Sequence, residues 1–67
     1  MMSIKEMRKL LNETQPEFSE HYGIPYRTIQ NWETGSRIPP DYVLALLERC
    51  VLEDYAQAKA EGELIHG

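Results

Sequence analysis

Gly23 lies between two short segments with helical spacing, and this arrangement restricts the fold more than any other feature of the sequence. Thr14 and Glu17 form a capping-box pattern, which predicts a helix that begins there and runs to about Tyr22. Glycine readily adopts the left-handed backbone that ends a helix and turns the chain. A second short helix is predicted over 26–33. The chain is therefore expected to turn sharply between two short helices.

The apolar residues around this turn fit two helices that cross steeply. Phe18 stands near the middle of the first helix, and Ile29 and Trp32 are spaced to face inward from the second. Ser19 supplies a small side chain where the two backbones must approach each other. These residues make up a helix-turn-helix pattern over about 14–34.

Helical patterns also flank this unit on both sides. Ser3 and Glu6 form another capping box, so a first helix is predicted from Ile4. A further helix is predicted over about 40–61, where a proline followed by a carboxylate suits the first turn. No strand alternation or repeat is visible, so we predict an all-α fold, a small bundle of four helices that forms a single domain over 1–67.

The predicted core draws apolar residues from every helix and from the turn. It consists of Ile4, Met7, Leu11, Phe18, Ile24, Ile29, Trp32, Val43, Leu46 and Leu47. The last helix carries apolar residues on more than one side, and four of them suit either the core or self-association: Leu44, Leu47, Val51 and Tyr55. Cys50 is interpreted as a small apolar residue of the core or of an interface.

The distribution of charge matters more than its total. The chain has 7 basic and 11 acidic residues, a net charge of −4, which taken alone argues against a nucleic-acid partner. Residues 1–40, however, contain five basic and five acidic residues, whereas residues 41–67 contain two basic and six acidic ones. The acidic excess therefore belongs to the C-terminal part, and a locally positive face remains compatible with the first forty residues.

Composition also excludes several classes of protein. No apolar stretch approaches the roughly 18–20 residues that span a bilayer, and the N-terminus lacks the apolar centre of a secretory signal. A single cysteine excludes an internal disulfide framework and a multi-thiolate metal site. His21 reads as a surface residue, and no catalytic, metal-ligand or phosphate-loop pattern is visible. We therefore expect a cytoplasmic protein that is not an enzyme, does not contact membranes and has no cofactor or metal.

The outer face of the predicted helix over 26–33 carries polar side chains and no carboxylate. Tyr26, Arg27, Gln30 and Asn31 lie there, with Thr28 near its edge. These side chains are long enough to reach the edges of bases in a DNA groove. Glu33 follows Trp32 and is interpreted as structural, because a carboxylate facing phosphates would repel them.

Residues 14–40, TQPEFSEHYGIPYRTIQNWETGSRIPP, resemble the Cro and phage-repressor (XRE) family of helix-turn-helix proteins. The motifs that carry the resemblance are the T-Q start, E-F-S-x-x-Y-G-I-P, T-I-x-x-W-E-x-G and R-x-P-P. The family usually has alanine where Ser19 stands, and a fifth helix that often forms the dimer interface. Here a longer acidic helix takes that place. The resemblance implies a lambda-repressor-like DNA-binding domain.

The resemblance also implies roles for individual residues. Tyr26, Arg27, Gln30 and Asn31 would contact bases in the major groove, Arg27 on guanine and Asn31 on adenine. The residues that would contact backbone phosphates are Gln15, Thr28, Thr34, Ser36 and Arg37. Other uses remain open for some of them. Arg27 and Arg37 also suit a solvated surface, Tyr26 suits packing over the turn, and Gln15 suits capping its own helix.

These observations predict a sequence-specific DNA-binding transcriptional regulator that acts as a repressor. One helix-turn-helix unit reads few base pairs, so a homodimer on double-stranded DNA is expected, associated with the nucleoid when bound. The alternative is an antitoxin or interaction module whose acidic helix over about 40–61 binds a toxin or another basic protein.

Overall fold

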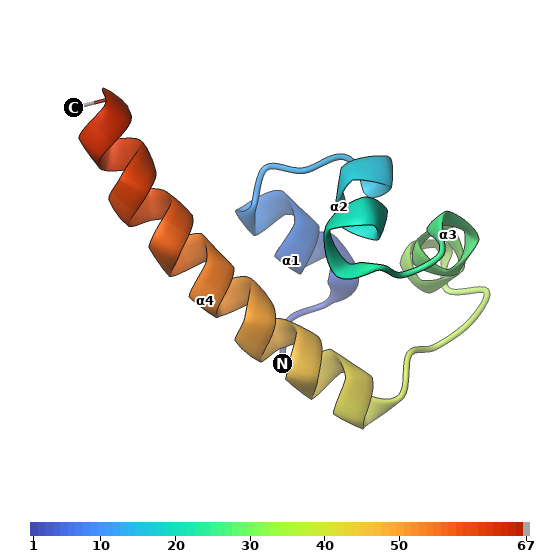
Figure 1. Ribbon diagram of the computed structural model, residues 1–67. Helices are drawn as coiled ribbons and strands as arrows, with labels where there is room; N and C mark the ends of the chain where they lie inside the picture. Colours follow the sequence, from blue (N-terminus) through green and yellow to red (C-terminus); the bar gives the residue numbers. More distant parts are fainter. Residues whose placement is uncertain (67) are drawn as a thin grey trace.

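The computed structural model describes the backbone of residues 1–66 and the side chains of residues 1–61. In this part of the chain the elements are α1 (Ile4–Leu10), α2 (Gln15–Tyr22), α3 (Tyr26–Thr34) and α4 (Asp41–His66), without any strand. α3 packs against both α1 and α2, and α1 also packs against α4 (Figure 1). The C-terminal part of α4 extends past the other helices (Figure 1). The predicted all-α fold with four helices is confirmed.

Two complete capping boxes begin α1 and α2. The Ser3 hydroxyl accepts the backbone N–H of Glu6 at 3.1 Å, and the Glu6 carboxylate accepts that of Ser3 at 2.8 Å. Thr14 and Glu17 repeat the arrangement at 3.3 and 2.8 Å. In each box the bond from the backbone N–H lowers the pKa of the glutamate, because it favours the ionised form. These local bonds explain why both helix starts could be predicted.

The turn between α2 and α3 depends on two residues with different roles. Gly23 has φ +66°, the left-handed backbone that glycine adopts without steric cost, and its N–H donates to the Ser19 carbonyl. The Ile24 N–H donates to the same carbonyl at 3.0 Å, and the Ser19 hydroxyl donates to the Ile24 carbonyl. Ser19 is therefore more than a small residue at a close approach, because its side chain also fixes the turn.

The buried core consists of residues from α1, α2, α3 and α4. Its members are Ile4, Met7, Phe18, Ile29, Leu47 and Val51. Of the other predicted core residues, Leu11, Ile24, Trp32 and Val43 are partly buried against this cluster. Leu46 was predicted wrongly, since it is 58% exposed. It lies about 100° around the helix from Leu47, which faces the bundle.

The apolar residues of α4 are thus divided between the core and the surface. Leu47 and Val51 are buried and Leu44 packs against the core, which places these three residues in the core of the chain; Tyr55 is partly buried. Cys50 is exposed, so of the two locations predicted for it, the core and an interface, the core is wrong. The helix begins one residue later than predicted and continues to His66 rather than ending near 61, because no proline follows to stop it.

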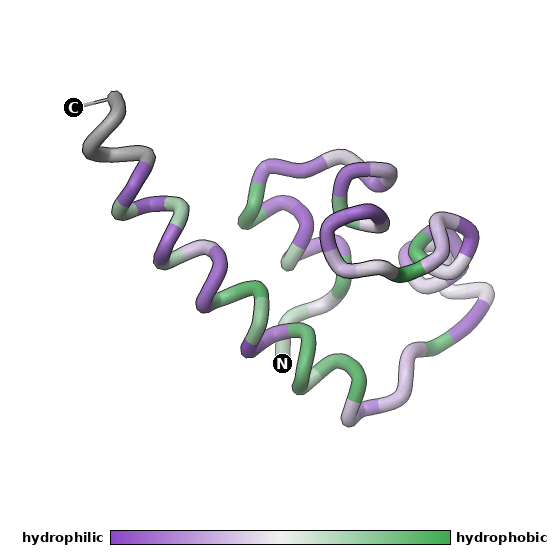
Figure 2. Tube along the Cα trace, viewed as in Figure 1, coloured by the Kyte–Doolittle hydropathy of each residue, from purple (hydrophilic) through white to green (hydrophobic). Residues whose placement is uncertain are grey.

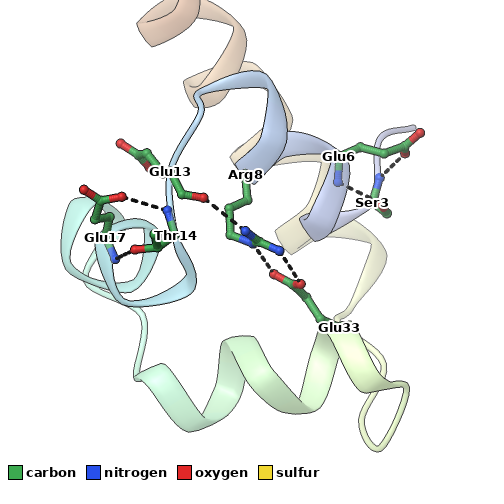
Figure 3. A network of polar contacts seen from close by, with 7 residues as sticks. All are labelled: Ser3, Glu6, Arg8, Glu13, Thr14, Glu17 and Glu33. Carbon is green, nitrogen blue, oxygen red and sulfur yellow. Dashed lines mark hydrogen bonds and ion pairs between the residues drawn. The ribbon is translucent and has the colours of Figure 1, made fainter.

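Arg8 connects three segments of the bundle (Figure 3). Its Nε and Nη2 atoms donate to the two carboxylate oxygens of Glu33 at 2.8 and 3.0 Å. Its Nη1 atom donates to the Glu13 carbonyl at 3.1 Å. The Arg8 bond is the largest cause that lowers the pKa of Glu33. Arg8 thereby ties α1 to α3 and to the loop before α2, which is the structural role expected for Glu33.

A second polar cluster joins α2 to α4. The Tyr22 hydroxyl donates to the Asp54 carboxylate at 2.7 Å, and burial followed by this bond raises the pKa of Tyr22. The His21 ring lies 2.9 Å from a Glu13 carboxylate oxygen and 3.4 Å from one of Asp54. His21 is exposed, as predicted, and its two carboxylate partners come from the loop before α2, 8 residues away in sequence, and from α4. The cluster fixes α2 against the middle of α4.

Candidate nucleic-acid interface

α3 presents its polar side chains on the side away from the core. Ile29 is fully buried, whereas Arg27 is exposed and Tyr26 is 44% exposed. Gln30 and Asn31 are partly buried and follow Tyr26 and Arg27 by four residues, one helical turn later. The four residues predicted to contact bases therefore share one side of α3.

The N-terminus of α3 differs from that of the other helices. Its N-cap is Pro25, which offers no side-chain hydrogen bond, and its first turn contains no acidic residue. α1, α2 and α4 carry Glu6, Glu17 and Asp41 in their first turns. The partial positive charge at the start of α3 is thus not offset by a local carboxylate, which favours an approaching phosphate.

A hollow of about 330 Å³ adjoins α3. It brings together a residue predicted to contact bases and residues predicted to contact phosphates. It is lined by Thr28, Asn31, Trp32, Arg37 and Ile38. The loop folds back here because Gly35, at φ +86°, ends the helix and the Arg37 N–H donates to the Asn31 carbonyl at 3.2 Å. Asn31, a predicted base-contact residue, therefore lies beside two residues predicted to contact phosphates.

Thr34 and Ser36 are both exposed at the end of α3. The Thr34 hydroxyl lies 3.0 Å from that of Ser36 and also donates to the Asn31 carbonyl at 3.3 Å. These bonds shape the loop that carries Arg37. Each hydroxyl retains oxygen lone pairs, and Arg37 itself is exposed.

Gln15 is the first residue of α2 and is partly buried. Thr14 is the N-cap of that helix, so Gln15 does not cap it. Its amide lies beside Glu33 and contributes to the lowered pKa of that carboxylate, after the larger effect of Arg8. Gln15 is thus positioned near the C-terminal part of α3, on the helix that precedes the turn.

The only carboxylate on α3 is already paired. The Glu33 side chain is 6% exposed and bonded to Arg8. The positive charge of Arg8 offsets the negative charge of Glu33, which lies close to Gln15. Lys5 from α1 also lowers the pKa of Glu33 through its charge. Sequence reasoning missed Lys5 and Ile38 at this surface. An isoleucine in an otherwise polar loop was the available signal for Ile38, whereas nothing in the sequence signals the approach of Lys5 to α3.

Other site types find little support in the part of the chain that the structure describes. No group of three or more histidine, cysteine or acidic residues there is arranged to hold a metal ion. Likewise, none of the described helices combines the length and the apolar character that crossing a membrane requires.

Comparison with known proteins gives one match. A family model described as Helix-turn-helix matches residues 4–50, which include α1, α2, α3 and the start of α4. Neither the curated proteins nor the solved structures contain a significant match to the chain.

Proposed function

Because the chain belongs to the Cro/C1-type (XRE) helix-turn-helix family of DNA-binding, typically non-enzymatic domains, we propose that it is a sequence-specific transcriptional regulator that acts as a repressor. The observation that carries the proposal is the outer side of α3. It combines four polar side chains, no free carboxylate and a helix N-terminus without a local negative charge. A major groove admits one such helix.

In the proposed complex α3 lies in the major groove. Arg27 donates two hydrogen bonds to one guanine, and Asn31 pairs with an adenine through its amide. Tyr26 and Gln30 contact neighbouring bases. Both arginine and asparagine present a planar pair of hydrogen-bonding groups, which is why they discriminate between bases.

Phosphate contacts surround the base contacts and set the register of the helix. Gln15 meets the backbone from the start of α2, where its own N–H is not used by the capping box of Thr14 and Glu17. At the other side are Thr28, Thr34, Ser36 and Arg37. The hollow that Thr28 and Arg37 both line gives a phosphate oxygen room to approach these two residues.

One unit of this size reads too few base pairs for useful selectivity, so we propose a homodimer on a pseudo-palindromic site. The two half-site centres would lie about 34 Å apart, one turn of B-DNA. A dimer that covers this length of a promoter blocks access for the transcription machinery, which makes it a repressor. The protein has few basic residues, so its affinity is expected to depend on base contacts and dimerisation more than on charge.

DNA-binding measurements with two variants, one at an arginine and one at a lysine, test this proposal. Arg27→Ala should weaken binding to the preferred site by about 1–3 kcal/mol, and weaken binding to random DNA much less. Lys59→Ala is the matched control, because it removes the same charge from the exposed, distant part of α4. Equal losses for both variants, or no salt-dependent binding to any duplex, would reject base readout by α3.

An antitoxin or interaction module is the second candidate, favoured by the part of α4 that extends past the bundle (Figure 1). Glu61 is exposed there, and Glu53 is exposed just before that part, next to the Asp54 that bonds to Tyr22 of α2. A basic partner, such as the product of an adjacent gene, would bind this segment. Co-purification with that product, abolished by Glu53→Lys combined with Glu61→Lys but not by Arg27→Ala, would favour this function.

A further inference from the structure

Three large apolar side chains are exposed around the start of α4. Ile38, Tyr42 and Leu46 are 84%, 69% and 58% exposed. Tyr42 and Leu46 are four residues apart and so lie one above the other on α4, whereas Ile38 lies in the loop just before this helix. We call these three residues the apolar strip.

An open hollow of about 300 Å³ borders the strip on one side. It is almost entirely apolar and is lined by Tyr22, Ile24, Trp32, Val43, Leu46, Leu47 and Cys50. We call it the apolar groove. Leu46 belongs to both the strip and the groove, and Trp32 separates the groove from the hollow beside Arg37. The groove therefore adjoins the surface proposed to contact DNA at Trp32, and Ile38 of the strip lines the hollow on that surface.

The arrangement of hydropathy along α4 shows where a partner would bind. Figure 2 colours the first half of α4 largely hydrophobic and its extending half largely hydrophilic. Between Asp41 and Glu48 the sequence YVLALL contains no ionisable group other than the Tyr42 phenol. Contiguous exposed apolar surface next to such a groove marks a site that another surface covers.

We propose that a second copy of this chain covers the strip and the groove, pairing across a twofold axis near Leu46. The proposal deepens the proposed function, which requires two recognition helices, and names the surface that joins them. A twofold interface must be complementary to itself. This surface meets that condition, because the projecting Tyr42 and Leu46 of one copy can fill the groove of the other.

The charges beside the strip favour an antiparallel pairing of the two α4 helices. Asp41 and Arg49 are both exposed and lie on the same flank of the strip, at opposite ends of it. When two copies of the segment run antiparallel about Leu46, Arg49 of one copy approaches Asp41 of the other. A basic protein partner would instead be drawn to the acidic residues farther along, such as Glu53 and Glu61.

The size of the surface predicts how stable the dimer is. A stable interface usually buries about 800 Å² on each partner, more than three side chains supply. The strip and the groove must therefore be covered together, and their limited area keeps the affinity of the pairing low. We expect a dimer that dissociates on dilution and that a palindromic duplex strengthens.

Sedimentation equilibrium on the full chain without DNA tests the interface. The wild type should shift from monomer to dimer as its concentration rises, and Leu46→Glu should remain monomeric. Leu52→Glu is the matched control, since Leu52 is 45% exposed on the same helix but does not line the groove. Tyr42→Ser should weaken the dimer as well, which guards against misfolding of the Leu46 variant. Far-ultraviolet circular dichroism checks that each variant is folded.

Cys50 gives an independent measurement, because it is the only cysteine and lines the groove. In the antiparallel pair the two Cys50 sulfurs lie about 15 Å apart, from the helical rise and the usual spacing of packed helices. A bismaleimide of that length should link two wild-type or Leu52→Glu chains and fail to link Leu46→Glu chains.

A monomeric wild type at all concentrations, or equal dimerisation of Leu46→Glu, would overturn the interface even if the chain binds DNA. Conversely, loss of the dimer in Leu46→Glu alone would support the interface even if no duplex binds, and only the proposed function would then fail.

Discussion

The contact between Arg8 and Glu33 provides a quantitative test of how the bundle holds α3 in place. Replacing Arg8 with methionine keeps much of the apolar stem but removes two bonds to Glu33 and one to the Glu13 carbonyl. Glu33 is only 6% exposed, so its carboxylate would lose its partner without gaining full hydration. Breaking a buried pair in this way costs about 3–5 kcal/mol.

The expected cost here is smaller, because Arg8 is itself 17% exposed and water can reach the site. We expect Arg8→Met to lower the free energy of unfolding by about 2–3 kcal/mol. A chain of this length is stabilised by about 3–10 kcal/mol in total, so the loss should be obvious in urea denaturation followed by circular dichroism. Adding Glu33→Gln to Arg8→Met should restore part of the lost stability, because no unpaired charge then remains in the buried site.

The pH dependence follows from the lowered pKa of Glu33, caused first by its bond from Arg8. A carboxyl group with a lowered pKa stabilises the fold fully above its ordinary value of 4.5, and loses this contribution as the pH falls through the lowered value. The stability difference between wild type and Glu33→Gln should therefore shrink in acid. Glu20→Gln, at an exposed position, is the control and should change stability little. An Arg8→Met variant with the same free energy of unfolding as the wild type would refute the stabilising role of the contact between Arg8 and Glu33.

Five further substitutions, at four positions, test other features of the structure. Tyr22→Phe removes the 2.7 Å bond to Asp54 and should lower the free energy of unfolding by about 1–2 kcal/mol; an unchanged melting curve would show that the cluster does not hold α2 on α4. Gly23→Ala should cost about 1–2 kcal/mol through the positive φ alone, since a Cβ there would meet nothing within 4 Å, and Gly23→Asn should cost less. Val51→Ala should destabilise by roughly 1–3 kcal/mol and Leu46→Ala by much less in dilute solution, because Val51 is fully buried and Leu46 faces solvent; equal losses would contradict the observed burial.

Helix starts and turns were predictable because their causes are local. The two capping boxes and Gly23 act within a few residues of chain, and the structure contains each of them. Contacts between distant segments were not predictable in the same way. Arg8 and Glu33 are 25 residues apart, and only the packing of α1 against α3 brings them together.

The error at Leu46 has a similar origin. Leu47 follows three other apolar residues, Leu44, Ala45 and Leu46. Periodicity alone therefore does not identify the buried side of α4.

In the candidate site, too, local patterns could be predicted from the sequence, whereas contacts between segments could not. The shared side of Tyr26, Arg27, Gln30 and Asn31 followed from helical spacing, whereas the hollow beside Asn31 depends on how the loop after Gly35 folds back.

Selection of bound duplexes from a randomised pool tests the central claim, sequence-specific DNA binding through α3, most directly. We predict an enriched pseudo-palindrome whose half-site centres are separated by about 10 base pairs, one helical turn. Repeating the selection with Asn31→Ala should remove the preference at one base position in each half-site and leave the others. A pool that shows no enrichment, or an Asn31→Ala motif identical to that of the wild type, would contradict the claim.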